Sequence, residues 1–207
     1  MKHIIIRTGA YEVNCHVIWN VPGCAFVIDP GADAEEIIRV VKSNSLALAG
    51  ILCTHGHCDH ISAICDVLAE FPVPVVMSEA DSVWAFTPLN SLPPYYAAPK
   101  SKPANLGATF PALSGDASVP ALRIMPTPGH SPGSVCYVCD EARVVFTGDT
   151  LFDGSIGRTD FPGGDASAMR RSLAAVAFLP DDYAVFPGHG GQTTIGRQKS
   201  TNPYLRN

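Results

Sequence analysis

The chain has 207 residues, of which 46% are hydrophobic and 16% charged, a composition typical of a globular protein and not of a disordered or fibrous one. Its formal net charge is −5, and its 14 lysines and arginines form no basic block, which argues against a nucleic-acid surface. No stretch is long and apolar enough for a membrane span. We therefore expect a single domain over residues 1–207, a monomer or small homo-oligomer, with a small molecule as its partner.

The first half of the chain predicts strands alternating with helices. Asp33, followed three residues later by Glu36, is typical of a helix N-terminus, and apolar residues at helical spacing come next. A second helix is expected over residues 59–71. Short apolar runs favour five strands, at 3–8, 14–19, 24–29, 46–53 and 73–77.

A Pro-, Gly- and Ser-rich segment, at about 87–120, separates the two halves and predicts a loop-like insertion. Its Tyr95 and Tyr96 either stack on a substrate or pack the insertion itself, and the packing role is the preferred interpretation. The second half predicts a helix at 165–178 and strands at 121–125, 134–139, 143–148 and 183–186. Two strand-rich halves flanked by helices imply an α/β sandwich.

The seven cysteines have no framework spacing, and the N-terminal apolar run is too short for a signal peptide. Both features favour a reducing, cytoplasmic location. Cys136 and Cys139 form a Cys-x-x-Cys pair, but an offset of three along a strand places the side chains on opposite faces. A redox or metal-binding role is therefore not expected for this pair.

A cluster of potential metal ligands stands in "CTHGHCDH", residues 53–60. His55 and His57 are two residues apart at the end of an extended segment, so both rings can point toward one ion. Asp59 and His60 begin the following helix and project differently, as a second adjacent ion would require. Cys58 lies inside the motif, and a passive packing role is the preferred interpretation.

Further ligand-type residues follow three later strands. His130 and His189 each stand in a Pro-Gly-His turn directly after a predicted strand, and Asp149 follows the strand at 143–148. A carboxylate can bridge two cations through its two oxygens, which an imidazole cannot do. His3 and His16 lie within strand patterns and are expected to be structural.

The residues from Thr54 to His60, followed by His130, Asp149 and His189, resemble the metallo-β-lactamase fold superfamily over nearly the whole chain. The resemblance implies an α/β fold, a four-layer αββα sandwich with the metals at one edge of the two sheets. It assigns His55, His57 and His130 to a first metal and Asp59, His60 and His189 to a second, bridged by Asp149. "VIDPG" at 27–31 is similar to the strand end that supports the metal site in this superfamily.

The implied cofactor is a pair of divalent ions, with zinc expected and iron or manganese as alternatives. Two such ions can activate water as a hydroxide and polarise a carbonyl, so the implied activity is hydrolysis of an activated acyl group. Asp59 and Asp149 would be the catalytic carboxylates of this site.

"GDTLFDGSIGRTDFPGGD" and the C-terminal "PGHGGQTTIGRQKSTNPYL" resemble the short glyoxalase II-like hydrolases. That similarity implies an acyl thioester substrate of the S-lactoylglutathione type, with Arg158 presented to a substrate carboxylate. The chain ends soon after His189, so we expect no C-terminal helical glutathione-binding domain. A glutathione-contacting tyrosine of glyoxalase II is also replaced, by Gly191.

Three alternatives stay open. "GRTDF" also resembles the persulfide dioxygenases of the same superfamily, which use a single iron. β-Lactam hydrolysis is less expected, because Asp149 stands where many β-lactamases of this fold have a cysteine ligand. A non-catalytic metal-binding module is the least expected, because complete ligand sets are seldom purely structural.

Overall fold

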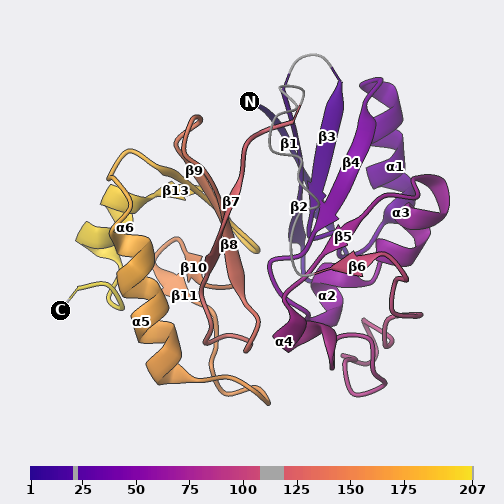
Figure 1. The fold of residues 1–207 in the computed structure, drawn as a ribbon. Helices are drawn as coiled ribbons and strands as arrows, with labels where there is room; N and C mark the ends of the chain where they lie inside the picture. The colour runs from indigo at the N-terminus through magenta and orange to yellow at the C-terminus, as the bar shows by residue number, and fades with distance from the viewer. Residues whose placement is uncertain (21–22, 108–118, 207) are drawn as a thin grey trace. The chain divides into compact units, whose positions relative to one another are not determined.

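A computed structural model describes residues 1–20, 23–107 and 119–206, and it divides the chain into two compact units. Unit 1 comprises Met1–Ala121 and unit 2 comprises Leu122–Asn207. Each unit contains one main β-sheet with helices packed on it (Figure 1). Part of the predicted insertion, residues 108–118, lies outside the described residues.

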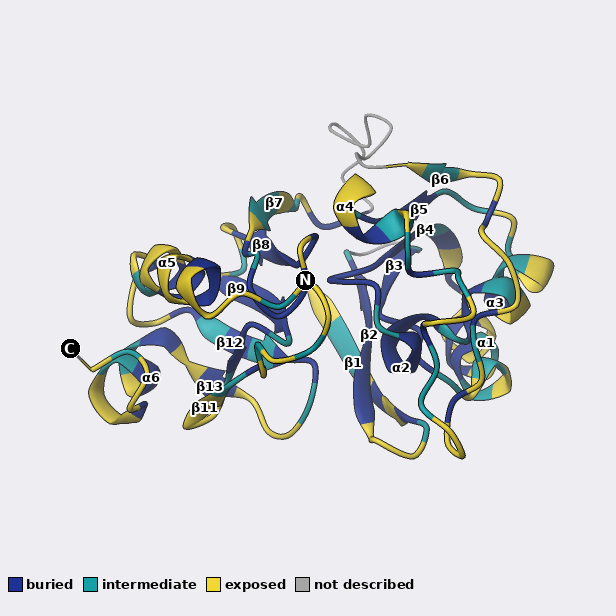
Figure 2. Ribbon diagram, turned by 90° about the horizontal axis from the view of Figure 1, so that it is seen from below, coloured by how far each residue is buried: buried dark blue, intermediate teal, exposed yellow. Residues whose placement is uncertain are grey.

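The sheet of unit 1 has six strands in sequence order within the described residues. Its first three strands are antiparallel, and β3 to β6 are parallel. The strands are β1 (Lys2–Thr8), β2 (Val13–Trp19), β3 (Cys24–Ile28), β4 (Ala47–Leu52), β5 (Val75–Val76) and β6 (Leu106–Gly107). The first four confirm the predicted strands to within one or two residues, because long apolar runs form buried strands. β2 is buried along its whole length (Figure 2).

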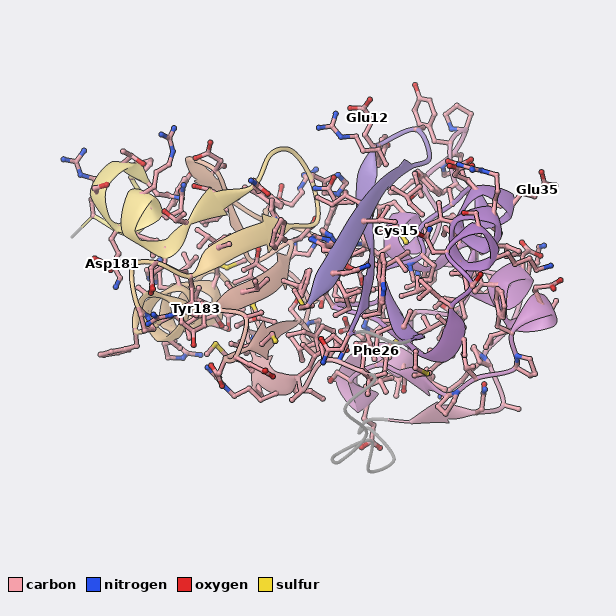
Figure 3. The ribbon with its side chains drawn as sticks, turned by 90° about the horizontal axis from the view of Figure 1, so that it is seen from above. Glu12, Cys15, Phe26, Glu35, Asp181 and Tyr183 are labelled. Atoms are coloured by element: carbon pink, nitrogen blue, oxygen red, sulfur yellow. The ribbon has the colours of Figure 1, made fainter. Side chains whose placement is uncertain are left out.

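Helices α1 (Ala34–Ser43) and α3 (Ile64–Glu70) pack side by side against this sheet (Figure 1). Ile37, Val41 and Val67 are fully buried in the core that the helices share with the strands. Cys15 and Phe26 lie inside the unit, whereas Glu12 and Glu35 project outward (Figure 3). The apolar stripe predicted after Asp33 thus faces the sheet.

The helix N-terminus predicted at Asp33 is confirmed, but a capping bond is not what holds it. Asp33 does occupy the N-cap position of α1, but with a φ of 52° and no capping bond from its side chain to the described residues. Its Oδ2 instead accepts a hydrogen bond from the Gly9 N–H at 2.8 Å. Glu36 pairs with Arg39 one turn later. Asp33 therefore ties the β1–β2 turn to the start of the helix.

The helix predicted at 59–71 is confirmed in part: the segment is helical, but it forms two helices, α2 (Cys58–Ile61) and α3, with a break between them. The Ala63 N–H donates to the carbonyl of Pro30 at 3.1 Å, so a tertiary bond replaces a helical one. Gly31 allows this close approach, because a Cβ there would lie 1.9 Å from the Asp59 carbonyl oxygen.

The sheet of unit 2 has the strand order β13-β12-β9-β8-β7 within the described residues. Its strands are β7 (Arg123–Pro126), β8 (Val135–Cys139), β9 (Val144–Gly148), β12 (Ala184–Pro187) and β13 (Thr193–Thr194). A separate hairpin joins β10 (Leu151–Phe152) and β11 (Ser155–Ile156). β7, β8, β9 and β12 confirm predicted strands, whereas the two-residue strands are too short for a periodicity to reveal.

Two helices cover this sheet, α5 (Ala166–Ala177) and α6 (Ile195–Thr201) (Figure 1). Asp165 caps α5, as its side chain accepts from the N–H groups of Ser167 and Ala168. Met169 and Leu173 of α5 are buried in the core of the unit. Tyr183 is buried and Asp181 is exposed on the stretch leading into β12 (Figure 3).

The part of the predicted insertion that the structure describes is mostly irregular, and its Tyr96 packs against Tyr11 of the β1–β2 turn. Tyr96 is buried, and its ring lies 5.5 Å from that of Tyr11, whereas Tyr95 is exposed. A short helix, α4 (Glu79–Ser82), precedes this region and was not predicted. No helix in the described chain has both the length and the apolar character needed to cross a bilayer.

Candidate metal centre

The first half of the candidate site lies in unit 1, in residues 53–60, which run from the end of β4 into α2 and are called here the histidine loop. Asp29, at the end of the neighbouring strand β3, is 1% exposed and holds this loop. Its Oδ1 accepts from the Thr54 N–H at 2.7 Å, and its Oδ2 accepts from the Thr54 hydroxyl at 2.6 Å. The carboxylate of Asp29 in "VIDPG" therefore fixes the backbone from which His55 projects.

The histidine rings of this loop lie against one another, and two of them, His55 and His60, are held through their Nδ1 atoms. His60 Nδ1 lies 3.0 Å from Asp29 Oδ2, and His55 Nδ1 lies 3.0 Å from the Thr54 hydroxyl. The ring of His55 is 4.2 Å from that of His60 and 4.9 Å from that of His57. A hydrogen bond at Nδ1 fixes the tautomer that presents Nε2 as the ligand atom, a common arrangement around metal-binding histidines.

The donor set of unit 1 fits a divalent cation. Ligand atoms of Asp29, His55 and His60 lie within 4.8 Å of one another, and these side chains are buried. His60 Nε2 lies 3.8 Å from Asp59 Oδ2. Imidazole nitrogens with a carboxylate oxygen are the donors that zinc and iron prefer. The Asp29 carboxylate also accepts three hydrogen bonds, two from Thr54 and one from His60, and so orients these two residues.

Cys58 lies within this loop but is buried, and burial raises the pKa of its thiol to about 12. Its backbone N–H is bonded to the side chain of Asn90 at 3.0 Å. A protonated, buried thiol is consistent with the packing role expected for Cys58.

The second half of the candidate site lies in unit 2, where three strand ends place His130, Asp149 and His189. β9 and β12 run parallel, with Pro187 opposite Gly148, so Asp149 and His189 emerge at the same edge of the sheet. Asp149 Oδ2 lies 3.5 Å from His130 Nε2 and 3.6 Å from His189 Nε2. Two atoms bound to one tetrahedral ion, at about 2.1 Å each, are about 3.4 Å apart. The distance from Asp149 Oδ2 to each of the two histidines is thus close to that between two ligands of one ion.

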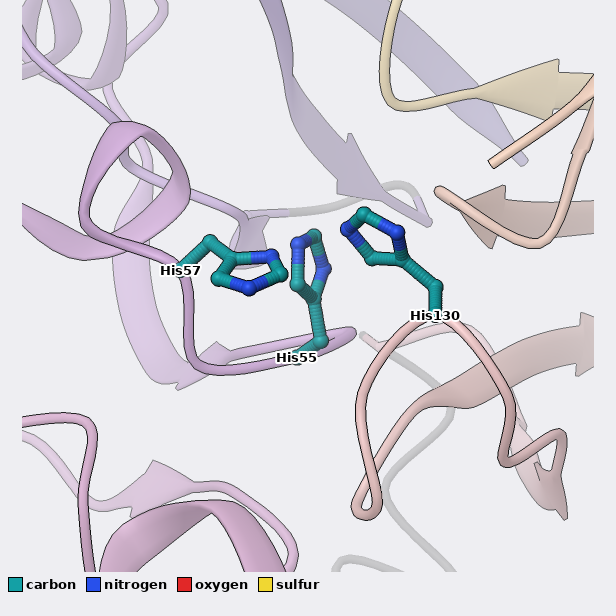
Figure 4. A group of neighbouring side chains, drawn as sticks. All are labelled: His55, His57 and His130. Atoms are coloured by element: carbon teal, nitrogen blue, oxygen red, sulfur yellow. The ribbon is translucent and has the colours of Figure 1, made fainter. Parts of the chain in front are cut away.

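His130 is oriented by the loop that contains Arg158. Its Nδ1 lies 2.8 Å from the Arg158 carbonyl oxygen, so Nδ1 donates and Nε2 keeps the lone pair that a metal ion would need. Gly157 allows this close packing, because a Cβ there would lie 1.8 Å from the Asp149 carbonyl oxygen and 3.2 Å from His130 Nδ1. Figure 4 draws His130 on its loop after β7, together with His55 and His57 on the loop after β4.

The Arg158 side chain is anchored beside His130. Its Nε and Nη2 donate to the two carboxylate oxygens of Asp160, each at 2.7 Å, and its guanidinium lies 3.9 Å from the centre of the Phe161 ring. The bond from Arg158 lowers the pKa of Asp160 to about 2. The guanidinium stays half exposed and so presents a fixed positive charge at the surface.

Outside these halves, His3 and His16 hydrogen-bond to each other at 2.9 Å across β1 and β2, which agrees with a structural role. Cys136 and Cys139 are buried thiols, and burial raises the pKa of Cys136 to about 11. Two side chains that the sequence did not single out, Asp81 and Asn90, bond to the backbone of the histidine loop. They are isolated polar residues in a mixed, proline-containing stretch, so no local pattern reveals them.

Comparison with known proteins identifies the family of the chain. Residues 8–189 match the family model described as the metallo-β-lactamase superfamily. The chain belongs to this superfamily. Its fold is the metallo-β-lactamase fold of the α/β class, which confirms the fold predicted from the histidine motifs.

Members of the superfamily resemble the chain over its full length. The hydroxyacylglutathione hydrolase GloC of Haemophilus influenzae is 35% identical, covering 97% of this chain and 96% of that protein. The crystal structure of the B3 metallo-β-lactamase BLEG-1 superimposes with a TM-score of 0.91 at 34% identity, covering both chains completely. The structure of TTHA1623 in a di-iron-bound form has a TM-score of 0.82 at 30% identity, covering 98% of this chain and all of that one.

Proposed function

We propose that this superfamily member is a hydrolase of small acyl thioesters, of the S-lactoylglutathione type, that works with two divalent metal ions. The observation that carries the proposal is the position of Asp149, whose Oδ2 lies 3.5 and 3.6 Å from two ligand-type nitrogens. The similarity to GloC, a hydroxyacylglutathione hydrolase, supports the substrate class.

The proposed ligands keep the assignment given by the sequence. His55, His57 and His130 hold one ion, and Asp59, His60 and His189 hold the other, with Asp149 shared between them. When bound, the ions supply an activated water and polarise the substrate carbonyl. Zinc is the proposed metal, and the di-iron form of TTHA1623 makes iron the alternative to test beside it.

The residues of the chain prepare the site for this chemistry. Asp29 and the Arg158 carbonyl fix His60 and His130 through their Nδ1 atoms, so the ligands need little reorganisation when a metal binds. The Arg158 guanidinium, held by Asp160 and Phe161, is proposed to bind a substrate carboxylate. A thiolate is a good leaving group, since a free thiol has a pKa of about 8.5, and its departure needs no strong general acid.

The test combines elemental analysis of the purified protein with thiol release from S-lactoylglutathione. About two metal ions per chain, together with metal-dependent thiol release, support the proposal. Arg158→Ala is expected to raise KM for this substrate and to change kcat little. Metal-loaded protein that releases no thiol would refute thioester hydrolysis. Oxygen uptake and sulfite formation from glutathione persulfide, with one iron per chain, would identify a persulfide dioxygenase instead.

A second candidate function is β-lactam hydrolysis, favoured by the likeness to BLEG-1 over the whole of both chains. Thioesters and β-lactams are both activated acyl compounds, and the same ions would serve either one. Nitrocefin assayed beside S-lactoylglutathione ranks the two activities. The thioester proposal requires the larger kcat/KM for the thioester.

A further inference from the structure

The segment from Glu79 to Asn90, called here the clamp segment, holds the histidine loop at Gly56 and Cys58, beyond the Thr54 contacts of Asp29. It begins with α4 and continues as turns to Asn90, all within unit 1. Two of its polar side chains are almost fully buried, with Asp81 0% and Asn90 6% exposed. Burying polar groups is costly unless they are hydrogen-bonded, so their partners indicate their purpose.

Asp81 and Asn90 bond to three successive peptide groups of the loop. Asp81 Oδ2 accepts from the Gly56 N–H at 2.8 Å. Asn90 Nδ2 donates to the Gly56 carbonyl at 2.8 Å, and Asn90 Oδ1 accepts from the Cys58 N–H at 3.0 Å. These bonds fix the peptide planes on both sides of His57 and the plane that follows His55. The backbone dihedrals that aim His57 are therefore set by the clamp segment.

The same segment packs tightly against the loop. A Cβ at Gly56 would lie 2.9 Å from the Cβ of Ala85, 3.1 Å from that of Asp81 and 3.3 Å from the Trp84 ring. The Trp84 ring centre is 5.3 Å from that of His57. Asn90 also donates to the Ala85 carbonyl at 2.6 Å, which closes the clamp segment on itself. The loop thus lies against a preformed surface and has little room to shift.

We propose that Asp81 and Asn90 are positioning residues for metal binding, which act by holding the backbone around His57. The inference rests on the proposed function to the extent that the loop binds metal. A role confined to packing predicts a different result: substitution lowers the stability of unit 1, and the protein that stays folded binds zinc as before. The two roles are separable because metal affinity and stability are measured independently.

The test compares Asn90→Leu and Asn90→Asp with the wild type. Leucine has a similar size and removes all three hydrogen bonds, whereas aspartate keeps an acceptor for the Cys58 N–H and loses both donated bonds. The matched control is Ile37→Ala, which disturbs the fully buried core of the same unit on α1. Zinc affinity is measured by chelator competition on folded protein, and thermal unfolding is recorded for each variant.

The expected result is a 10- to 100-fold loss of zinc affinity in Asn90→Leu, in the range of other residues that orient metal ligands, and a smaller loss in Asn90→Asp. Ile37→Ala is expected to lower the melting temperature and leave zinc affinity unchanged. Zinc binding by Asn90→Leu within twofold of the wild type overturns the proposal, as does an equal loss in Ile37→Ala. If Asn90→Leu does not fold, Asn90→Asp decides by the same twofold limit.

The outcome is distinguishable from the failure of thioester hydrolysis. Wild-type protein that binds zinc tightly but releases no thiol refutes the proposed substrate. The zinc affinities of the variants then still test whether the clamp segment positions His57. Wild-type protein that binds neither zinc nor iron refutes the metal site, and the proposal for Asp81 and Asn90 falls with it.

Discussion

Gly157 offers a sharp test of the geometry around Asp149, because it has no space for a side chain. Alanine at this position would place its Cβ 1.8 Å from the Asp149 carbonyl oxygen and 3.2 Å from His130 Nδ1. Both atoms belong to residues proposed as metal ligands. The Gly157 backbone is not in the left-handed region, so the effect of the substitution is steric and not conformational.

The size of the effect follows from these distances. The contact must open from 1.8 Å to at least 3.0 Å, and its partner is backbone, which cannot rotate away as a side chain would. Overpacking of this kind costs about 1–3 kcal/mol of unfolding free energy. Displacing Asp149 and His130 together is expected to lower zinc affinity at least about 10-fold.

The assay is urea unfolding together with chelator competition for zinc. Gly191→Ala is the matched control, because a Cβ there meets no described heavy atom within 4 Å and its φ is also ordinary. That control should stay within about 0.5 kcal/mol of the wild type. Wild-type zinc affinity in Gly157→Ala would refute the argument that Asp149 and His130 are ligands held by this loop.

Three further predictions concern individual side chains. Asp149→Ala should lose both ions, because one carboxylate is proposed to serve both, and near-normal metal content would contradict the bridging role. Cys58→Ala should keep its zinc and its thiol release within about twofold, because the loop is held through the Cys58 backbone and not its thiol; a tenfold loss would reveal a role for the sulfur. Burial lowers the pKa of His3 from 6.5 to about 4, so its contribution to stability is complete above pH 6.5 and is lost as the pH falls toward 4. Urea unfolding at pH 7.5 and 4.5 should therefore show a smaller loss of unfolding free energy on acidification in His3→Gln than in the wild type. The two losses should differ by at most about 3 kcal/mol, and equal losses would contradict the lowered pKa of His3.

The strands that could be predicted from the sequence are those formed by long runs of apolar residues. β2 is buried along its whole length and β4 over its last three residues, and continuous hydrophobic stretches identify such strands. The histidine motif was equally informative, because its ligand-type residues are close in the chain. The motif indicated the superfamily, which the family model confirms, and the superfamily predicted the fold without any knowledge of the strand order.

Features that depend on contacts between distant segments were missed. Asp33 looked like a capping residue, but the Gly9 N–H competes for its side chain. The helix predicted at 59–71 breaks because Ala63 bonds to Pro30, thirty-three positions earlier in the chain. Helix α6 is polar in sequence and is fixed by Gln198, which bonds to Asp153 and Thr193. Hydrogen bonds of this kind override the local preference for secondary structure, and the periodicity of apolar residues does not reveal them.

The histidine loop is held by Asp29 and by Asp81, which lie 25 residues before Thr54 and 25 residues after Gly56 respectively. The histidines are neighbours in the nascent chain, but their geometry exists only after both flanking segments have folded onto them. An unfolded chain would take up metals in the Irving–Williams order, with copper ahead of zinc and iron, because it imposes no geometry. The folded loop can discriminate by shape. For the proposed site, the metal in purified protein is therefore expected to depend on whether loading precedes or follows folding, and reconstitution of the folded apoprotein reports the preference of the site itself.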